Sequence, residues 1–174
     1  AVVGTGGVGS TLIQLARHLG AAPVIAVDLR PEKLEAALRM GATAAVDASA
    51  GDPVAQVAKL GGVDVALEAI GRPETVEQAF RMVRDGGRVV VVGVASPGIT
   101  APIEIVRLVR RGISITGSFG CRVRTDMPEV VRLAAAGVPD LEGSVTRRYR
   151  LDEINEAYAA MSRGDIVGRA IVVL

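Results

Sequence analysis

The sequence has few of the side chains that form disulfides, metal sites and aromatic platforms. Its 174 residues include one cysteine, Cys121, and one histidine, His18. These two cannot form an internal disulfide or supply the ligand set of a zinc site. Aromatic side chains make up 2% of the residues, and tryptophan is absent, which argues against a platform for stacking nucleic-acid bases. We therefore assign no catalytic or metal-binding residue within this chain.

The sequence also has no large excess of positive or negative charge and no long apolar run. Twenty Lys and Arg residues and nineteen Asp and Glu residues give a net charge of +1, so the composition indicates no broad basic surface for binding nucleic acid. No apolar run is long enough to predict a membrane span, and no secretory leader is visible. We expect no nucleic-acid or membrane partner and a cytoplasmic location. The chain begins inside an apolar run at Ala1, which we interpret as part of a longer protein.

Short runs of Val and Ile alternate with segments of helical period. Strands are predicted at residues 2–3, 24–27, 44–46, 63–67, 88–92 and 113–116, and helices at 8–19, 31–40, 53–60, 73–83, 102–111 and 127–136. Uniformly apolar strands are buried on both faces, as in a parallel sheet covered by helices. The pattern predicts an α/β fold: a doubly wound, parallel six-stranded Rossmann sheet in the order 3-2-1-4-5-6.

The rhythm changes after about residue 137. A short strand at 145–149, an amphipathic helix at 151–162 and a strand at 170–174 are predicted there. We therefore divide the chain into a dinucleotide-binding Rossmann domain over 1–137 and a C-terminal strand-helix-strand tail over 138–174.

The first predicted strand runs into a G-x-G-x-x-G motif at residues 4–9, directly before a predicted helix. In this context Gly4 permits a tight turn, Gly6 lets a pyrophosphate approach the backbone, and Gly9 lets the helix pack close to the strand. The amides of Gly7 and Val8 are expected to point at the phosphates, aided by the helix dipole.

An acidic residue, Asp28, ends the second predicted strand at the distance from the motif that a dinucleotide site requires. Its carboxylate is expected to accept hydrogen bonds from the adenosine ribose and to repel the 2′-phosphate of NADP, which favours NAD. Arg30 and Lys33 lie close by and are expected to flank the adenosine. The alternative for Asp28 is a helix N-cap.

Several motifs occur in order over essentially the whole chain: Gly4–Gly9, Val27-Asp28, Gly41-Ala42-Thr43, Val63–Glu68, Gly86–Gly93 and Leu151–Ala157. This series resembles the cofactor domain and tail of the zinc-dependent medium-chain alcohol dehydrogenase family. The resemblance implies an N-terminal catalytic domain, holding zinc, that this chain lacks.

The resemblance also implies further cofactor contacts, at the ends of later strands and in the tail. These residues are Ile70, Gly71 and Arg72 on the adenosine and diphosphate side; Val92, Gly93, Val94, Ser118 and Phe119 around the nicotinamide; and Arg169 at the pyrophosphate. Val92 could instead be an ordinary strand end, and Arg169 a surface cation. Glu68 could touch the cofactor pocket or cap a turn.

The resemblance thus implies the NAD-binding domain of an oxidoreductase that transfers a hydride between an alcohol or polyol and NAD. The chain alone is expected to be inactive, because zinc would be held outside it. Gly4-Thr5-Gly6 and Asp28 count against a first alternative, a zinc-free NADPH-dependent quinone or enoyl reductase of the same superfamily. A non-catalytic dinucleotide-binding module is a second alternative.

Self-association is the last expectation. The family resembled forms homodimers or homotetramers through an edge strand, for which the candidate here is Ile99–Ile103. Ile99, Ala101 and Ile103 alternate with Thr100 and Pro102, which gives one apolar face. The alternative is a loop covered by its own chain.

Overall fold

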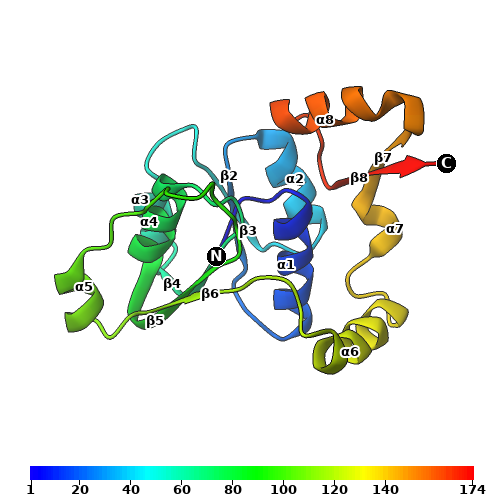
Figure 1. Cartoon of the computed structure of the whole chain (residues 1–174). Coiled ribbons are helices and arrows are strands. Elements are labelled where there is room, and N and C mark those ends of the chain that lie inside the picture. The colour runs from blue at the N-terminus through cyan, green and yellow to red at the C-terminus, as the bar shows by residue number, and fades with distance from the viewer.

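A parallel sheet with helices on both faces forms the centre of the computed structural model, which describes residues 1–174 (Figure 1). Its strands are β1 (Val2–Val3), β2 (Ile25–Asp28), β3 (Ala44–Asp47), β4 (Val63–Glu68), β5 (Val83–Val91) and β6 (Ser114–Gly117). All pairings are parallel and the order is β3-β2-β1-β4-β5-β6. The predicted doubly wound Rossmann sheet is therefore confirmed.

Helices connect successive strands of this sheet. They are α1 (Gly7–His18), α2 (Pro31–Arg39), α3 (Pro53–Lys59), α4 (Pro73–Met82) and α5 (Ile105–Arg110), with α6 (Val123–Ala135) after the last strand. Proline is the first residue of α2, α3 and α4, where its missing N–H has no partner to lose. No helix combines the length and the apolar composition that crossing a bilayer requires.

Alternate residues of the central strands β1 and β2 face two separate cores. Val3 and Val27 pack with Phe80 of α4 in one core, under α3 and α4. Val2 packs with Ile13 of α1 in the other, under α1 and α2. Because both of their faces are buried, β1 and β2 are apolar up to Asp28, whereas β6, whose four residues are all exposed, contains Ser114 and Thr116.

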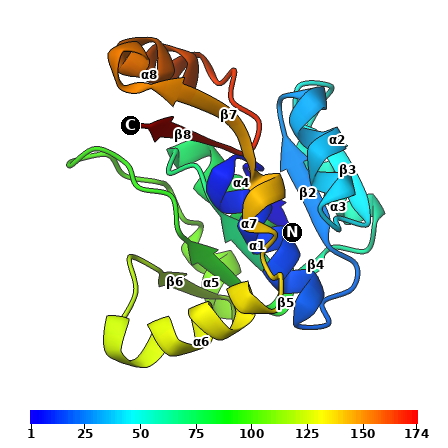
Figure 2. The same ribbon diagram turned by 90° about the vertical axis from the view of Figure 1, so that its right-hand side faces the viewer.

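The tail forms a second, smaller sheet (Figure 2). After α7 (Leu141–Ser144), the strands β7 (Val145–Arg150) and β8 (Arg169–Val173) pair in parallel, joined by a 3-10 turn (Leu151–Glu153) and α8 (Ile154–Arg163). The predicted strand-helix-strand order is confirmed, while the domain division at residue 137 stays a prediction. The short α7 was not predicted; Asp140 caps it by accepting the N–H of Gly143 at 2.8 Å.

Three predicted boundaries are wrong. Helix α5 begins at Ile105, three residues after Pro102, and α6 begins at Val123, before Pro128. Strand β5 begins at Val83 and includes Asp85-Gly86-Gly87, which lie between the helix predicted at 73–83 and the strand predicted at 88–92. The pairing of β4 with β5 shifts register there, because the extra residues bulge out of the ladder.

The candidate edge segment Ile99–Ile103 forms no strand in this single chain, where β6 is the last strand of the sheet. Ile99 is 54% exposed, and Ile103 packs partly against the core beneath α4. The strand is thus absent from the isolated chain, and its formation on dimerisation stays a prediction.

Candidate functional site

The sheet has its topological switch point between β1 and β4. These strands are neighbours, but the helices that follow them, α1 and α4, cover opposite faces of the sheet. In such sheets the ligand crevice lies outside the carboxyl ends of the strands at that point. The segments that follow β1, β2, β4, β5 and β6 meet at this edge because all of these strands are parallel. They contain nearly all of the predicted cofactor residues.

The turn after β1 depends on two glycines for packing. Gly4 has φ +86°, and a Cβ there would lie 2.4 Å from Cγ1 of Ile70. A Cβ on Gly9 would lie only 1.8 Å from the carbonyl oxygen of Gly4. Helix α1 can therefore pack this close to β1 only with glycine at position 9, as the motif predicts.

Gly6 differs because the space beside it is open: apart from its two chain neighbours, no residue has an atom within 4 Å of the position that its Cβ would take. Helix α1 begins at Gly7, and no side chain caps its N-terminus. The first amides of a helix lack intrahelical acceptors and carry its positive dipole end. The amides of Gly7 and Val8 are thus available to an anion beside Gly6, which is the geometry that a pyrophosphate requires.

Arg169, at the start of β8, brings a cation to this turn from the tail. A Cβ on Gly7 would lie 3.3 Å from Cγ and 3.6 Å from Nη1 of Arg169. The Arg169 side chain is otherwise exposed. The fold therefore brings Arg169, for which the sequence also allowed a surface cation, next to the glycine turn.

Asp28 is fixed beside the same turn by four hydrogen bonds. Its Oδ2 accepts the N–H of Thr5 at 2.8 Å and the Thr5 hydroxyl at 3.0 Å. Its Oδ1 accepts the N–H groups of Leu29 and Arg30 at 2.8 and 3.2 Å. The carboxylate stays half-exposed at the end of β2. Sequence reasoning missed Thr5, which occupies a variable position of the motif.

Two carboxylates, Glu32 and Asp165, lie close to the guanidinium of Arg30. Arg30 Nε donates to Glu32 at 2.7 Å, and its Nη2 lies 3.8 Å from Asp165 of the tail. The hydrogen bond and charge of Glu32, with a smaller contribution from Asp165, raise the pKa of Arg30; the Arg30 hydrogen bond lowers the pKa of Glu32. Lys33 lies nearby: its Nζ would be 3.7 Å from a Cβ on Gly164. No sequence pattern indicates the contact with Asp165.

The turns after β4 and β5 pack backbone against backbone. A Cβ on Gly93 would lie 2.0 Å from the amide nitrogen of Gly71, and a Cβ on Gly71 would lie 2.5 Å from that of Val94. Gly71 also has φ +87°. Arg72 follows as the exposed N-cap residue of α4. The two segments that the resemblance assigns to opposite halves of the cofactor are therefore in direct contact.

Glu68, at the end of β4, holds the first of these turns. Its Oε1 accepts the N–H groups of Ile70 and Gly71 at 2.9 and 2.8 Å and the Thr75 hydroxyl at 2.7 Å. Of the two roles that the sequence left open, the structure shows the turn cap.

The remaining predicted residues lie at the ends of β5 and β6. Val92 is half-buried, and its N–H donates to the carbonyl oxygen of Glu68 at 2.8 Å. Ser118 donates its N–H to the carbonyl of Val91 at 2.9 Å, next to this edge. Phe119 is 89% exposed, so its side chain is not packed into the site.

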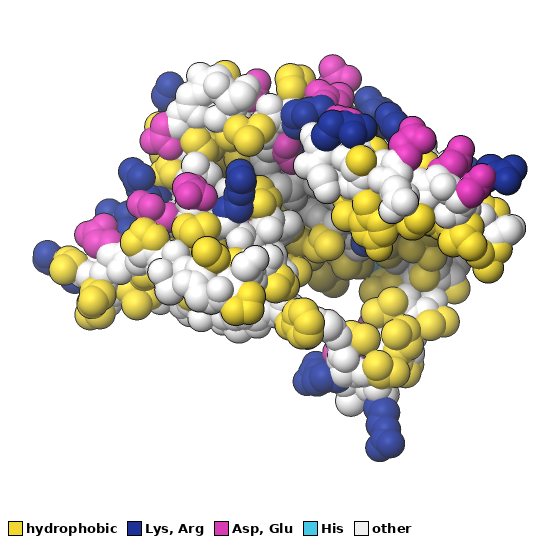
Figure 3. Space-filling model, turned by 45° about the horizontal axis from the view of Figure 1, so that its top comes forward, with side chains coloured by type: hydrophobic (Ala, Val, Ile, Leu, Met, Phe, Trp, Pro, Cys, Tyr) yellow, Lys and Arg dark blue, Asp and Glu magenta, His cyan; other side chains and the backbone are white.

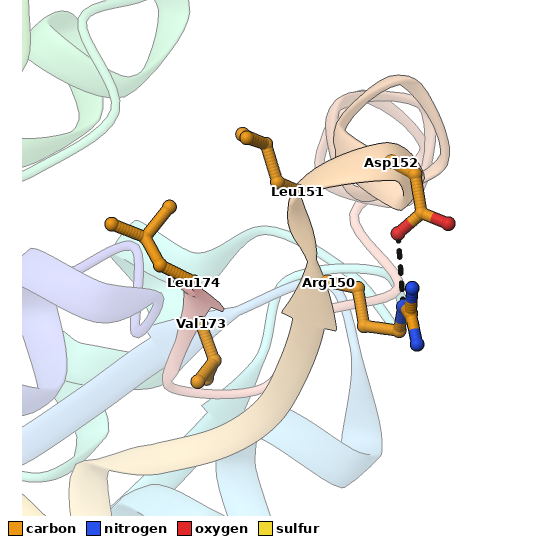
Figure 4. Close-up of a pocket in the computed structure, with 5 residues that line it drawn as sticks. All are labelled: Arg150, Leu151, Asp152, Val173 and Leu174. Carbon is orange, nitrogen blue, oxygen red and sulfur yellow. Dashed lines mark hydrogen bonds and ion pairs between the residues drawn. The ribbon is translucent and has the colours of Figure 1, made fainter.

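The residues present do not fit a zinc site. No three His, Cys, Asp or Glu side chains lie close enough to hold a metal ion, and Cys121 is exposed in the loop after β6. A surface pocket lies elsewhere, at the ends of β7 and β8, beside the ion pair of Arg150 and Asp152 (Figure 4). Its lining contains none of the predicted cofactor residues.

Proteins of similar sequence and fold are known. Residues 7–136 match the family of zinc-binding dehydrogenases. An alcohol dehydrogenase of Geobacillus stearothermophilus is 35% identical over all of this chain and half of its own length. Benzyl alcohol dehydrogenase of Acinetobacter calcoaceticus superimposes with a TM-score of 0.90 at 34% identity, over 98% of this chain and 48% of its own.

A zinc-binding dehydrogenase of Sinorhizobium meliloti, solved with NADP, superimposes with a TM-score of 0.87 at 33% identity, over 99% of this chain and 51% of its own. The chain thus spans about half the length of the relatives that it matches. The family model covers most of the chain, and the fold and motif order agree with it. The chain belongs to the zinc-binding dehydrogenase family.

Proposed function

We propose that this chain is the NAD-binding part of an alcohol or polyol dehydrogenase. The open space beside Gly6 carries the proposal, because it adjoins the uncapped N-terminus of α1, and Arg169 lies beside the next residue, Gly7. Uncapped amides and a guanidinium together favour a pyrophosphate over a neutral ligand. Asp28, in turn, would accept hydrogen bonds from an adenosine ribose.

Two features favour NAD over NADP. The Asp28 carboxylate is held by four donors and would face a 2′-phosphate with like charge. Arg30, the cation best placed to bind such a phosphate, already pairs with Glu32 and lies near Asp165. Since the Sinorhizobium relative was solved with NADP, cofactor choice within the family has to be decided by residues such as these.

The chain's own residues bind and orient the cofactor. When bound, NAD accepts or returns a hydride at nicotinamide C4. The turn at Gly93 and Val94, held against Gly71, would support the nicotinamide half, with Ser118 beside it. The chain offers no ligand set for zinc, so we propose that zinc and the alcohol substrate bind to another part of a longer, cytoplasmic enzyme and that this chain alone does not turn over.

Neither alternative has a specific observation in its favour. A quinone or enoyl reductase that prefers NADPH requires a site for the 2′-phosphate, which Asp28 and the paired Arg30 oppose. A non-catalytic module would use the same cofactor site. Alcohol oxidation by a longer protein that contains this chain would separate that module from a dehydrogenase.

Calorimetric titration of the purified chain with NAD and NADP tests the proposal. We expect NAD to bind at least tenfold more tightly, a difference of about 1.4 kcal/mol. Asp28→Ala should reduce that ratio towards one, because it removes both the ribose acceptor and the like charge. Asp64→Ala, which removes an exposed aspartate at the opposite end of β4, is the control and should keep the ratio. Equal affinities in the parent would refute the role of Asp28.

A further inference from the structure

Glu68 is a buried carboxylate without a countercharge. It is 0% exposed, at the end of β4 beside the switch point, and none of the ion pairs of the structure includes it. Its Oε2 is buried with no hydrogen-bond partner. Burying such a group costs free energy, whereas an apolar side chain of the same size would fill the space without that cost. Packing alone therefore does not explain why a carboxylate is here.

All three donors to its other oxygen, Oε1, come from one short segment. These are the amides of Ile70 and Gly71 and the hydroxyl of Thr75, in the turn after β4 and the first turn of α4. An ionised acceptor makes stronger hydrogen bonds than a neutral one. The carboxylate thus fixes the turn in the conformation that places Gly71 at φ +87°.

The backbone of the same residue holds the second turn. The carbonyl oxygen of Glu68 accepts the N–H groups of Val92 and Gly93 at 2.8 and 3.0 Å. Gly93 in turn packs against Ile70 and Gly71, since a Cβ on Gly93 would lie 2.4 Å from the carbonyl carbon of Ile70 and 2.0 Å from the Gly71 nitrogen. Glu68 thereby fixes the relative position of the turns after β4 and β5.

We propose that Glu68 is a positioning residue for the dinucleotide, fixing the diphosphate-side turn against the nicotinamide-side turn before the cofactor binds. This rests on the proposed function, because both turns are assigned to NAD there. It goes beyond that function by naming the side chain that fixes the positions of the two turns relative to each other. Without the carboxylate, the turn would have to be ordered at the expense of binding free energy.

Two substitutions of similar size separate positioning from packing. Glu68→Met removes the acceptor and the buried carboxylate; the avoided desolvation offsets part of the loss of three hydrogen bonds, so the Tm should fall no more than in the structural control below while the Kd for NAD rises at least tenfold. Glu68→Gln keeps an oxygen for the three donors and should stay within about threefold of the parent Kd. Thr43→Val is the structural control: Thr43 binds the backbone of Val24 at the far end of the sheet, so its loss should lower stability and leave the Kd unchanged.

Amide hydrogen exchange adds a measurement that needs no cofactor. In Glu68→Met, the amides of Ile70 and Gly71 should exchange at least tenfold faster, while those of the β4 core keep their protection. If Glu68→Met does not fold, Thr75→Val removes one donor and should raise the Kd severalfold. A Kd for NAD equal to that of the parent in Glu68→Met would overturn the proposal. The same result in Thr75→Val would do so if Glu68→Met does not fold. Unchanged amide exchange at Ile70 and Gly71 would also overturn it. A parent chain that fails to bind NAD would refute the proposed function, and the exchange rates would then decide the role of Glu68.

Discussion

Two glycines of the same motif, Gly6 and Gly9, should respond to substitution in opposite ways. Gly9 is at the contact of α1 with the turn after β1, where a Cβ would lie 1.8 Å from the carbonyl oxygen of Gly4. Apart from its two chain neighbours, no residue has an atom within 4 Å of the Cβ position of Gly6, and its φ of −70° suits any residue. We therefore predict that Gly9→Ala damages the fold, whereas Gly6→Val damages only cofactor binding.

The magnitudes follow from the contacts. A Cβ essentially never lies closer than 3.0 Å to another heavy atom, so Gly9→Ala has to move α1 by about 1.2 Å, the difference between 3.0 and 1.8 Å. Overpacking of this kind costs about 1–3 kcal/mol or more, while alanine returns about 1 kcal/mol of helix propensity. We expect a net loss of about 2 kcal/mol and a Tm lower by roughly 4–8 °C.

Gly6→Val should change stability by less than about 1 kcal/mol, because its side chain enters open space. The same side chain would occupy the place of the pyrophosphate, so NAD affinity should fall at least a hundredfold, about 2.7 kcal/mol. Differential scanning calorimetry and titration with NAD measure the two effects independently. Parent-like NAD binding by Gly6→Val, or a parent-like Tm for Gly9→Ala, would refute this division of roles.

Two further predictions concern an ion pair and an interface. Carbon-13 titration of the Glu32 carboxyl should give a pKa below the ordinary 4.5 in the parent, and a value closer to it in Arg30→Gln, which removes the hydrogen bond that lowers it. Because the folded pKa is lowered, the pair stabilises the chain above about pH 4.5 and this contribution is lost as the pH falls through the folded pKa. In sedimentation, the parent should form a dimer at high micromolar concentration, whereas the double substitution of Ile99 and Ile103 by Lys should give monomers that bind NAD normally.

Most of the main sheet could be predicted because local and long-range requirements agree in it. The central strands β1 and β2 are apolar on both faces, and a proline such as Pro31 or Pro73 begins a helix where its missing N–H has no consequence. The glycine turn and Asp28 could also be predicted, because close backbone packing requires the glycines and Asp28 lies at the end of β2 at the spacing that the motif sets. The start of β5 was missed because Asp85-Gly86-Gly87 has turn composition. The ladder with β4 pairs Val83 and resumes only at Arg88, so these residues bulge out of the strand pairing.

Contacts between distant segments could not be predicted. The pairing of Arg30 with Asp165 joins residues of the main sheet and the tail, and neither residue type indicates its partner. Thr5 binds Asp28 through a side chain at a position that the motif leaves free. The assignment of Phe119 to the nicotinamide side stays a prediction: its side chain is 89% exposed in the single chain, and contacts through its backbone would not bury that side chain.

The segment Ile99–Ile103 shows how a strand prediction can depend on a second molecule. Its alternation of apolar residues is that of a strand, yet the isolated chain gives its backbone no neighbouring strand to pair with. Ile99 is 54% exposed, and Ile105 and Val109 of the following α5 are 73% and 72% exposed. Hydrophobic side chains also recur over the face drawn in Figure 3. An apolar segment with unpaired backbone groups is a site at which a second chain can add.

A twofold pairing would satisfy those backbone groups, apart from Pro102, which has no N–H to donate and must face outward. Fully burying an isoleucine contributes about 1.5–3 kcal/mol, so completing the partial burial of Ile99 contributes roughly half of that from each chain. Two lysines there would add like charges across the twofold axis and prevent pairing. Leu19→Lys, at an 80% exposed position beyond α1, is the matched control and should remain dimeric. A double Lys variant that still sediments as a dimer would place the interface elsewhere, with the exposed face of α5 as the next surface to substitute.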